Sequence, residues 1–274
     1  MNWLAKQSSW VPGENADMIH ALAIVDPAAK LSTNVTVGPW SIIGPEVEIG
    51  SGTVIGSHVV LKGPTRLGDY NKIYSFSSIG DDPQDKKYRG EKTYLEIGNH
   101  NVIREYCTIN RGTTQDKSLT KIGSHNLFMV GSHVAHDCVV GDHAIFVNNV
   151  ALAGHVTIGN YAILGAYSAV HQFCHIGDHS FIAASSMVRQ NVLPYILVEG
   201  GREARACGLN KEGLRRNGFT DEAISHLRCA YKLIFRKNLT VEQALEELKP
   251  LALHSPQVSL MTQALKNSER GIIR

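Results

Sequence analysis

Apolar side chains recur at every sixth residue over a long central stretch of the chain. Between residues 122 and 188 each of these positions holds an aliphatic residue or phenylalanine: Ile122, Phe128, Val134, Val140, Phe146, Leu152, Ile158, Leu164, Val170, Ile176, Ile182 and Val188. A helix repeats every 3.6 residues and a strand every two, so neither element alone explains this spacing. Six residues suit one short strand followed by a sharp turn, and three such repeats close one triangular coil.

The same rhythm occurs earlier in the chain. It runs without a break through Ile19, Val25, Leu31, Val37, Ile43, Ile49, Ile55, Leu61, Leu67, Ile73 and Ile79, and it resumes at Ile97, Ile103 and Ile109. Stacked coils bury such side chains as a continuous column, with parallel strands about 4.8 Å apart. We therefore predict an all-β parallel solenoid built from hexapeptide repeats over residues 19–193.

Glycine directly follows the apolar residue in several repeats. These glycines are Gly123, Gly141, Gly159, Gly165 and Gly177. Because glycine adopts a positive φ without steric cost, we expect the turns of the coil to use it at these positions.

Two polar segments interrupt the repeat, and we predict that they form loops over residues 80–96 and 110–121. Counting three repeats per coil places Ile79 and Ile109, which precede the loops, in one column with Val134, Leu152 and Val170. The loops should therefore leave the same edge that carries His136, His155, His171 and Gln172. Loops and histidines gathered on one edge predict a cleft.

The two ends of the chain do not follow the repeat. Residues 1–18 are expected to form an N-terminal lead-in, and a change of fold is expected near Pro194, because proline cannot donate to a strand ladder. Residues 194–274 are predicted to form a small α-helical C-terminal domain. Thr220 is a good N-cap for one helix, Thr240 opens a capping box for a second that ends at Pro250, and a third is expected over about residues 256–268.

Composition excludes several classes of function. A formal net charge of +2 and an aromatic content of 7% argue against a nucleic-acid-binding protein. No apolar run reaches the length of a membrane span, so we expect no stable membrane insertion. The five cysteines are scattered and odd in number, which indicates reduced thiols and a cytoplasmic location.

A histidine followed by an aspartate carries the chemical prediction. The imidazole of His136 can take a proton from a hydroxyl group near neutral pH, and Asp137 can fix its tautomer. Gly154 lies one coil further along, where a backbone N–H could stabilise an oxyanion. This combination predicts an acyltransferase.

Two other interpretations remain open at this point. His133, His136 and His155 could bind zinc, as in hexapeptide-repeat carbonic anhydrases, although the spacing is weakly specific. The solenoid could also be a purely structural protein that presents its loops to a partner. Metal analysis and an activity assay distinguish these possibilities.

Longer motifs add a specific resemblance that runs from about residue 19 to Arg274. The motifs are Gly80–Glu91, Asn110–Thr113, His133–Asp137, Leu152–His155, Ala169–Phe173 and Asn210–Arg216. Together they resemble the acyl-(acyl-carrier-protein):UDP-N-acetylglucosamine O-acyltransferase family, whose members transfer a 3-hydroxyacyl chain to the glucosamine 3-hydroxyl in the first step of lipid A biosynthesis. The resemblance implies a left-handed β-helix and a homotrimer.

The resemblance also implies roles for individual residues. His136 would be the general base, Asp137 its partner and Gly154 the oxyanion donor. Residues that would hold the sugar nucleotide and the acyl group are Asp85, Lys87, His133, His155, His171 and Gln172. Residues that would reach the UDP of a site shared with the next subunit are Asn210, Glu212, Arg215 and Arg216. Ala184 would close the far end of the acyl groove and set chain length.

The family implies no metal or redox cofactor. Its donor substrate is an acidic acyl carrier protein with a phosphopantetheine arm, which we expect to dock on Lys121, Arg215 and Arg216. The alternative within the pathway is the later UDP-3-O-acylglucosamine N-acyltransferase. That relative usually carries a separate N-terminal uridine-binding domain, whereas the repeats begin here by residue 19.

Overall fold

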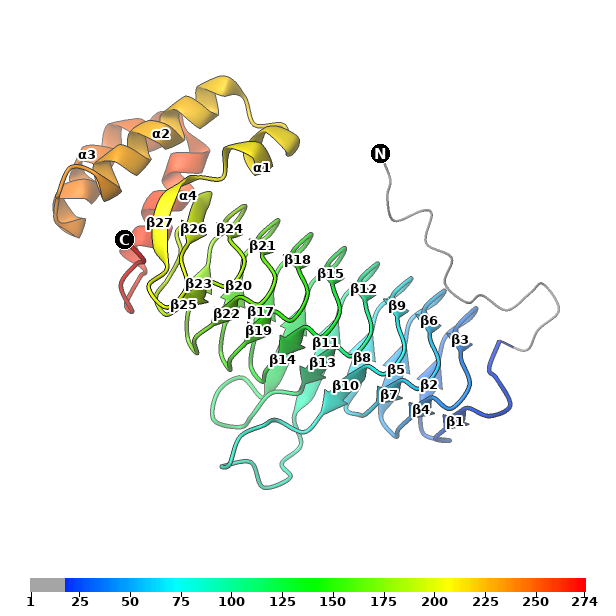
Figure 1. Ribbon diagram of the computed structural model, residues 1–274. Coiled ribbons are helices and arrows are strands. Elements are labelled where there is room, and N and C mark those ends of the chain that lie inside the picture. Colours follow the sequence, from blue (N-terminus) through cyan, green and yellow to red (C-terminus); the bar gives the residue numbers. More distant parts are fainter. Residues whose placement is uncertain (1–17) are drawn as a thin grey trace. The chain divides into compact units, whose positions relative to one another are not determined.

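The computed structural model describes residues 18–274 (Figure 1). The predicted lead-in, residues 1–18, lies outside the described residues except for Met18. The chain divides into two compact units, with the boundary between Cys138 and Val139, and each unit is described by itself.

The first unit winds through three parallel sheets of very short strands, the blue to green part of Figure 1. The first sheet has the order β1-β4-β7-β10-β13-β16, the second β2-β5-β8-β11-β14 and the third β3-β6-β9-β12-β15. The strands are β1 (Ile24–Val25), β2 (Lys30–Leu31), β3 (Thr36–Val37), β4 (Ile42–Ile43), β5 (Val47–Ile49), β6 (Val54–Ile55), β7 (Val60–Leu61), β8 (Thr65–Leu67), β9 (Lys72–Ile73), β10 (Ser78–Asp81), β11 (Tyr94–Ile97), β12 (Val102–Ile103), β13 (Thr108–Asn110), β14 (Leu119–Ile122), β15 (Leu127–Phe128) and β16 (His133–Val134). Consecutive strands belong to different sheets, as a three-sided coil requires.

The register of the first sheet confirms the predicted column within this unit. Ile43 pairs with Leu61, Leu61 with Ile79, Ile79 with Ile109 and Ile109 with Val134. All of these side chains are at most 1% exposed. The six-residue rhythm therefore marks the inward positions, and neither interruption hides a repeat.

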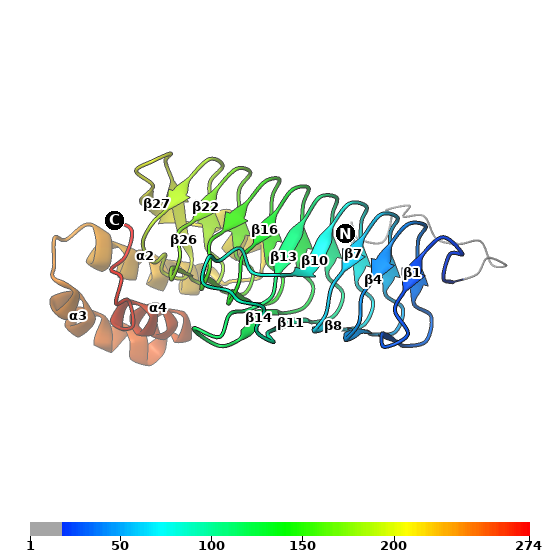
Figure 2. The same cartoon turned by 90° about the horizontal axis from the view of Figure 1, so that it is seen from below.

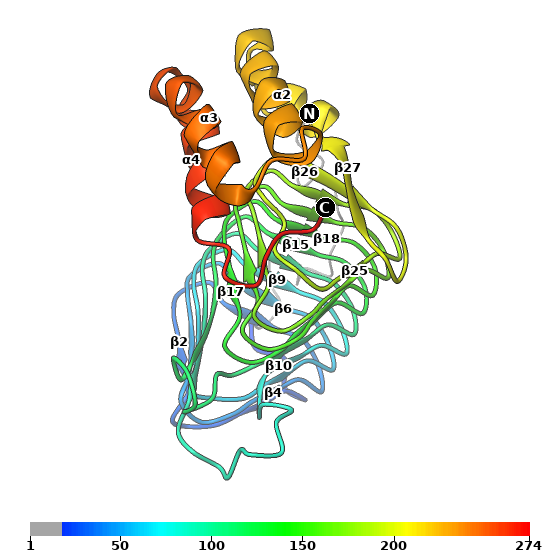
Figure 3. The same cartoon turned by 90° about the vertical axis from the view of Figure 1, so that its left-hand side faces the viewer.

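Both predicted loops emerge from this first sheet. The chain leaves β10 at Asp81 and returns at Tyr94, and it leaves β13 at Asn110 and returns at Leu119. The strands thus extend into the predicted loops 80–96 and 110–121, so the irregular segments are residues 82–93 and 111–118. Figure 3 shows the first of them projecting away from the coils of its unit.

The second unit also forms a coil of three sheets, and its strands β22, β26 and β27 are labelled in Figure 2. Its sheets have the orders β19-β22-β25, β17-β20-β23 and β18-β21-β24-β26-β27. The strands are β17 (Val139–Val140), β18 (Ile145–Phe146), β19 (Ala151–Leu152), β20 (Thr157–Ile158), β21 (Ile163–Leu164), β22 (Ala169–Val170), β23 (His175–Ile176), β24 (Phe181–Ile182), β25 (Met187–Val188), β26 (Ile196–Glu199) and β27 (Arg205–Leu209). All of its strand pairs are parallel except β26 with β27, which is antiparallel. Two strands therefore follow Pro194, where we expected the change of fold.

Four helices complete the second unit, and α2, α3 and α4 pack together. They are α1 (Lys211–Arg216), α2 (Asp221–Phe235), α3 (Val241–His254) and α4 (Pro256–Lys266). The predicted caps are confirmed, because Thr220 accepts from the N–H of Ala223 and Thr240 forms a capping box with Gln243. The predicted end of α3 at Pro250 is wrong. That helix continues to His254, with packing against α4 outweighing the hydrogen bond that proline cannot donate.

The turns do not use the five glycines in the predicted way. None of them has a positive φ, which falls instead two residues further on at non-glycine residues, such as His125 at 60° and Tyr161 at 57°. The glycines serve close approach between coils. A Cβ on Gly159 would lie 2.2 Å from Oδ1 of Asp178, and one on Gly165 would lie 2.5 Å from the N of Ala184. The space between coils, rather than the backbone angle, therefore explains glycine at these positions.

None of the helices within residues 18–274 is both long and apolar enough to cross a membrane. This agrees with the absence of a long apolar run in the sequence.

Candidate active site

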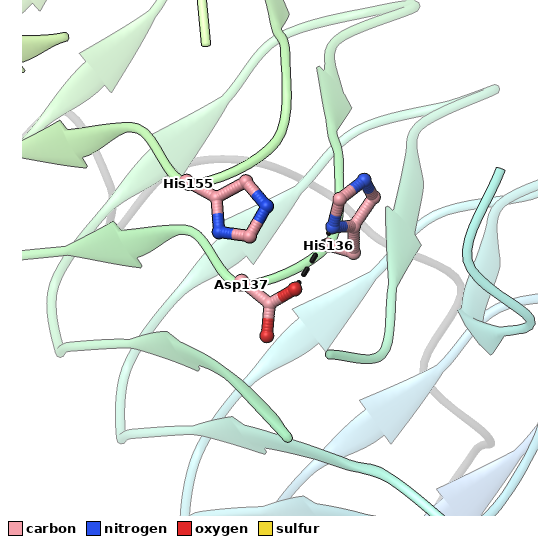
Figure 4. Close-up of side chains that lie close together, drawn as sticks. All are labelled: His136, Asp137 and His155. Carbon is pink, nitrogen blue, oxygen red and sulfur yellow. Dashed lines mark hydrogen bonds and ion pairs between the residues drawn. The ribbon is translucent and has the colours of Figure 1, made fainter. Parts of the chain in front are cut away.

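A histidine–aspartate pair occupies the turn that follows β16. Nδ1 of His136 lies 2.9 Å from Oδ2 of Asp137 (Figure 4). The side chain of Asp137 is fully buried and that of His136 is 13% exposed. Asp137 adopts a positive φ, which aspartate tolerates better than most residues. The turn therefore hides the carboxylate while leaving part of the imidazole accessible.

The carboxylate of Asp137 is held by the second loop. The N–H of Thr113 lies 3.0 Å from each carboxylate oxygen, and the hydroxyl of Thr113 lies 2.6 Å from Oδ2. The N–H of Asp137 donates in turn to Oγ1 of Thr120 at 2.8 Å. Several donors around a buried carboxylate favour its ionised form. An ionised carboxylate can only accept, so Nδ1 of His136 carries the proton and Nε2 carries the lone pair.

His133 lies three residues before His136, on the outer side of β16. Its Nδ1 is 2.7 Å from Oγ1 of Thr108. Burial lowers the pKa of His133 below its usual value, and the charge that His136 can carry lowers it further. His133 is therefore a neutral hydrogen-bonding group at neutral pH rather than a second cation.

The first loop is braced by an arginine of the second. Arg111 is 6% exposed, and its guanidinium donates to the carbonyl of Gly80 and to the carboxylate of Asp82. It also lies 3.1 Å from the hydroxyl of Tyr88. These contacts fix the two loops against each other within the first unit.

Asp85 and Lys87 lie in the first loop, as predicted. Oδ1 of Asp85 accepts from the N–H of Lys87 at 2.9 Å, so this carboxylate shapes the loop. Asp85 is half-buried and Lys87 is exposed. The ammonium group of Lys87 is thus accessible for an anionic ligand.

The motif Asn110–Thr113 is part of the family resemblance, but the sequence predicted no role for Arg111 or Thr113. Both side chains are buried at the base of a polar loop. The signal in the sequence was a charged residue, Arg111, and a hydroxyl residue, Thr113, placed shortly after the buried strand β13.

In the second unit, Gly154 and His155 form the turn after β19. Gly154 is buried, and its N–H has no hydrogen-bond acceptor among the described residues. The carbonyl of Gly154 accepts from the N–H of Phe173. The ring of His155 stacks on that of Phe173 with centroids 4.3 Å apart, and Figure 4 includes this histidine. A buried N–H without an acceptor is a suitable oxyanion donor.

His171 and Gln172 occupy the corresponding turn of the next coil, after β22, and both are exposed. Nδ1 of His171 lies 3.2 Å from the carbonyl oxygen of Gln172 and 3.4 Å from the guanidinium of Arg270. The C-terminal tail thus reaches a residue of the predicted substrate edge, which the sequence did not reveal. Ala184 is also exposed, at a turn between β24 and β25.

The predicted UDP-binding residues surround α1. Oδ1 of Asn210 accepts from the N–H of Gly213 as the N-cap of this helix, and its Nδ2 donates to the carbonyl of His179. Glu212 forms an ion pair with Arg215 at 3.3 Å. Arg216 is exposed. The side chain of Asn210 is therefore engaged in structure, whereas both arginines present accessible charge.

The zinc hypothesis assigns the ligands His133, His136 and His155. In the described structure Nδ1 of His133 is bonded to Thr108 and Nδ1 of His136 to Asp137, so each ring would bind a metal through Nε2. A carboxylate that accepts from the other ring nitrogen accompanies zinc-bound histidines as well as general bases, so metal removal, rather than this geometry, separates the two hypotheses.

Coils of hexapeptide repeats with a histidine–aspartate pair define a hexapeptide-repeat acyltransferase. The model of the "Bacterial transferase hexapeptide (six repeats)" family matches residues 28–63 and 155–190, and that of "Udp N-acetylglucosamine O-acyltransferase; Domain 2" matches residues 191–273. The chain is 57% identical to the acyl-(acyl-carrier-protein)–UDP-N-acetylglucosamine O-acyltransferase of Pseudomonas entomophila, over 92% of this chain and 97% of the relative. It is 55% identical to the enzyme of the same name from Stutzerimonas stutzeri, over 94% and 99%.

Among solved structures, LpxA from Acinetobacter baumannii is 51% identical and superposes with a TM-score of 0.92, covering 94% of this chain and all of the other. The chain belongs to the acyl-(acyl-carrier-protein)–UDP-N-acetylglucosamine O-acyltransferase family. Its fold is the left-handed β-helix of that family, followed by a small helical C-terminal part.

Proposed function

We propose that this acyltransferase moves a 3-hydroxyacyl chain from acyl carrier protein to the glucosamine 3-hydroxyl of UDP-N-acetylglucosamine, the first step of lipid A biosynthesis, with His136 as general base. The observation that carries the proposal is the hydrogen bond from Nδ1 of His136 to the buried carboxylate of Asp137. It leaves Nε2 as the basic nitrogen of a partly exposed ring. Relatives that bear the name of this activity support the choice of substrates.

The reaction then follows from proton transfer at Nε2. His136 takes the proton of the sugar hydroxyl as its oxygen bonds to the thioester carbonyl carbon. The carbonyl electron pair moves to oxygen, and the N–H of Gly154 stabilises the resulting oxyanion. The C–S bond then breaks, and the thiolate of the phosphopantetheine arm takes the proton from His136. Asp137 stabilises the imidazolium that exists between these two transfers.

The remaining predicted residues bind substrates in this proposal. Neutral His133 suits a hydrogen bond to the sugar, and the accessible ammonium of Lys87 suits the diphosphate. His155, His171 and Gln172 contact the sugar or acyl group, and Asp85 orients the loop that carries Lys87. Arg215 and Arg216 attract the UDP phosphates, with Glu212 and Asn210 organising α1 around them.

Acyl carrier protein is proposed to dock on the accessible basic residues Lys121, Arg215 and Arg216, which are all exposed. Attraction between opposite charges is screened by salt, with a Debye length of about 10 Å at 0.1 M. Rates at subsaturating donor should therefore fall as ionic strength rises, and Arg216→Gln should reduce that slope. A salt-independent rate would contradict electrostatic docking.

We further propose a cytoplasmic homotrimer that needs no metal or redox cofactor. Supporting the assembly, the first unit exposes a stacked column of Trp40, His58, Phe76 and Tyr106, with ring centroids 5.0–5.2 Å apart. Such an apolar surface suits contact with another protein surface. Free, buried thiols such as Cys107, whose pKa burial raises to about 11, fit a reducing compartment. Light scattering of the purified protein measures the oligomeric state.

One assay tests the function directly. Purified protein is incubated with 3-hydroxyacyl carrier protein and, in parallel reactions, UDP-N-acetylglucosamine or UDP-3-O-acylglucosamine, and the products are analysed by mass spectrometry before and after chelator treatment. We expect an ester on the sugar and no effect of the chelator. Acylation only of UDP-3-O-acylglucosamine at its amine would indicate the later enzyme of the pathway, and loss of activity with metal removal would support the zinc hypothesis.

A further inference from the structure

Thr113, in the second loop, holds the Asp137 carboxylate through both its main chain and its side chain. Its N–H is 3.0 Å from both carboxylate oxygens, and its hydroxyl is 2.6 Å from Oδ2, the oxygen that also accepts from His136. Thr113 and Asp137 are 0% and 1% exposed. We propose that Thr113 is a positioning residue of the reaction, which acts through Asp137 to keep the proton of His136 on Nδ1. This inference rests on the proposed role of His136.

The position of Thr113 is itself fixed by its neighbours. Its carbonyl accepts from the N–H groups of Asp116 and Ser118, which closes the loop into a compact turn. At Gly112 an added Cβ would lie 2.1 Å from the N of Leu119, so the loop base is shut tightly. Arg111, two residues before Thr113, binds the first-loop side through the carbonyl of Gly80 and the carboxylate of Asp82. Thr113 therefore presents its hydroxyl from a rigid support rather than from a loose loop.

The geometry explains why the hydroxyl matters beyond the main-chain N–H. The N–H lies 3.0 Å from both oxygens, so it holds the carboxylate without favouring either oxygen. The hydroxyl of Thr113 and Nδ1 of His136 bind the same oxygen, Oδ2. A half-turn of the carboxylate only exchanges two equivalent oxygens, so what the hydroxyl fixes is the twist of the carboxylate plane that directs one oxygen at Nδ1. Without it, the carboxylate can rotate away and the imidazole loses the acceptor that sets its tautomer.

Thr113→Val removes the hydroxyl while keeping size and the main-chain N–H. We expect kcat to fall about 10-fold, the lower range for losing a hydrogen bond to a charged group, with the KM of each substrate unchanged. Thr113→Ser restores the hydroxyl and should restore kcat. Thr114→Val is the matched control, because Thr114 is the exposed neighbour in the same loop. Its kcat should equal that of the wild type.

A double-mutant cycle with Asp137→Ala separates this role from a general effect on folding. If Thr113 acts through Asp137, Thr113→Val should cause no further loss of kcat in the Asp137→Ala background. An equal loss in both backgrounds would overturn the inference, and so would a Thr113→Val enzyme with wild-type kcat or a Thr113→Ser enzyme as slow as Thr113→Val. If the valine variant does not fold, Thr113→Ala takes its place in the cycle.

His136→Ala, measured in the same assay, distinguishes failure of this inference from failure of the proposed mechanism. An active His136→Ala enzyme would refute the assignment of His136 as general base, and with it the role of Thr113. An inactive one combined with an unaffected Thr113→Val enzyme would refute only the role of Thr113.

Discussion

Glu46 and Asp137 occupy the same position of the repeat with opposite results. Each lies three residues after a buried apolar residue of the first sheet, Ile43 and Val134, and each adopts a positive φ, 55° and 58°. Glu46 is 53% exposed at its side chain and pairs with Lys92. Asp137 is buried and accepts from Thr113 and His136. The coil supplies the same turn to both carboxylates, so the turn itself does not make a catalytic group.

The difference comes from what each loop brings to the turn. The first loop contributes Lys92, a long cation that stays in solvent, and the second contributes Thr113, a short neutral donor that covers the carboxylate. An exposed ion pair is screened by water, whereas a buried carboxylate keeps its influence on the ring beside it. The preceding residue is Pro45 in one turn and His136 in the other. Burial of the carboxylate and an adjacent imidazole together therefore distinguish the proposed catalytic turn at Asp137 from the structural turn at Glu46.

The largest expected effect is that of His136→Ala. Removing a general base typically costs about 100-fold or more in rate, so kcat should fall by at least about 100-fold while thermal unfolding remains close to wild type. His100→Ala is the control, because His100 is a turn histidine of the same unit stacked between Tyr70 and His125. The base assignment would be wrong if the two variants had similar kcat values.

Asp137→Asn and Glu46→Gln test the comparison at matched positions. An amide at residue 137 can donate to Nδ1 and so favours the wrong tautomer, and we expect a loss of about 10-fold or more that stays smaller than that of His136→Ala. Glu46→Gln removes only an exposed charge and should leave kcat unchanged. Equal effects of the two amides would mean that burial does not distinguish these turns.

Ala184→Met should change substrate preference rather than overall activity. Ala184 is the second residue after buried Ile182, as His136 is after Val134, so its side chain also stands at a turn. A small residue there leaves room for a long acyl chain, and each buried methylene is worth about 0.8 kcal/mol, or roughly fourfold in kcat/KM. Methionine should shift preference to shorter 3-hydroxyacyl donors. A length series that is identical in both proteins would show that Ala184 does not line the acyl groove.

The smallest expected effect concerns stability. Burial lowers the pKa of His179 below its usual value, although Asp178 partly opposes this, and Nδ1 of His179 is buried without a partner. Below about pH 6.5 the unfolded chain therefore binds more protons than the folded one, and the free energy of unfolding decreases as the pH is lowered. His179→Phe keeps the ring stack with Tyr161 and should lose less Tm than wild type between about pH 7.5 and 5.5. An identical loss would exclude His179 as a source of acid sensitivity.

The fold could be predicted because its signal is repeated. Inward residues such as Ile43 and Leu61 obey one period, and packing against the next coil leaves little freedom for other solutions. The contact between His136 and Asp137 could also be predicted, since adjacent residues at a turn are necessarily close. The burial of Asp137 by Thr113 was not readable, because it depends on how an irregular loop folds back over a distance that no periodicity fixes. The role of the glycines was mispredicted for the same reason, since it depends on contacts with residues of the next coil, which are distant in the sequence.

Arg111 couples the structures of the two loops. Its buried guanidinium connects Gly80 and Asp82 with the start of the segment that carries Thr113. Lengthening or exchanging one loop would leave this cation without its acceptors, and isolated buried charges are poorly tolerated. We therefore expect the sequences of the two loops to change together when such enzymes diverge, whereas the residues of the coil can change independently of them.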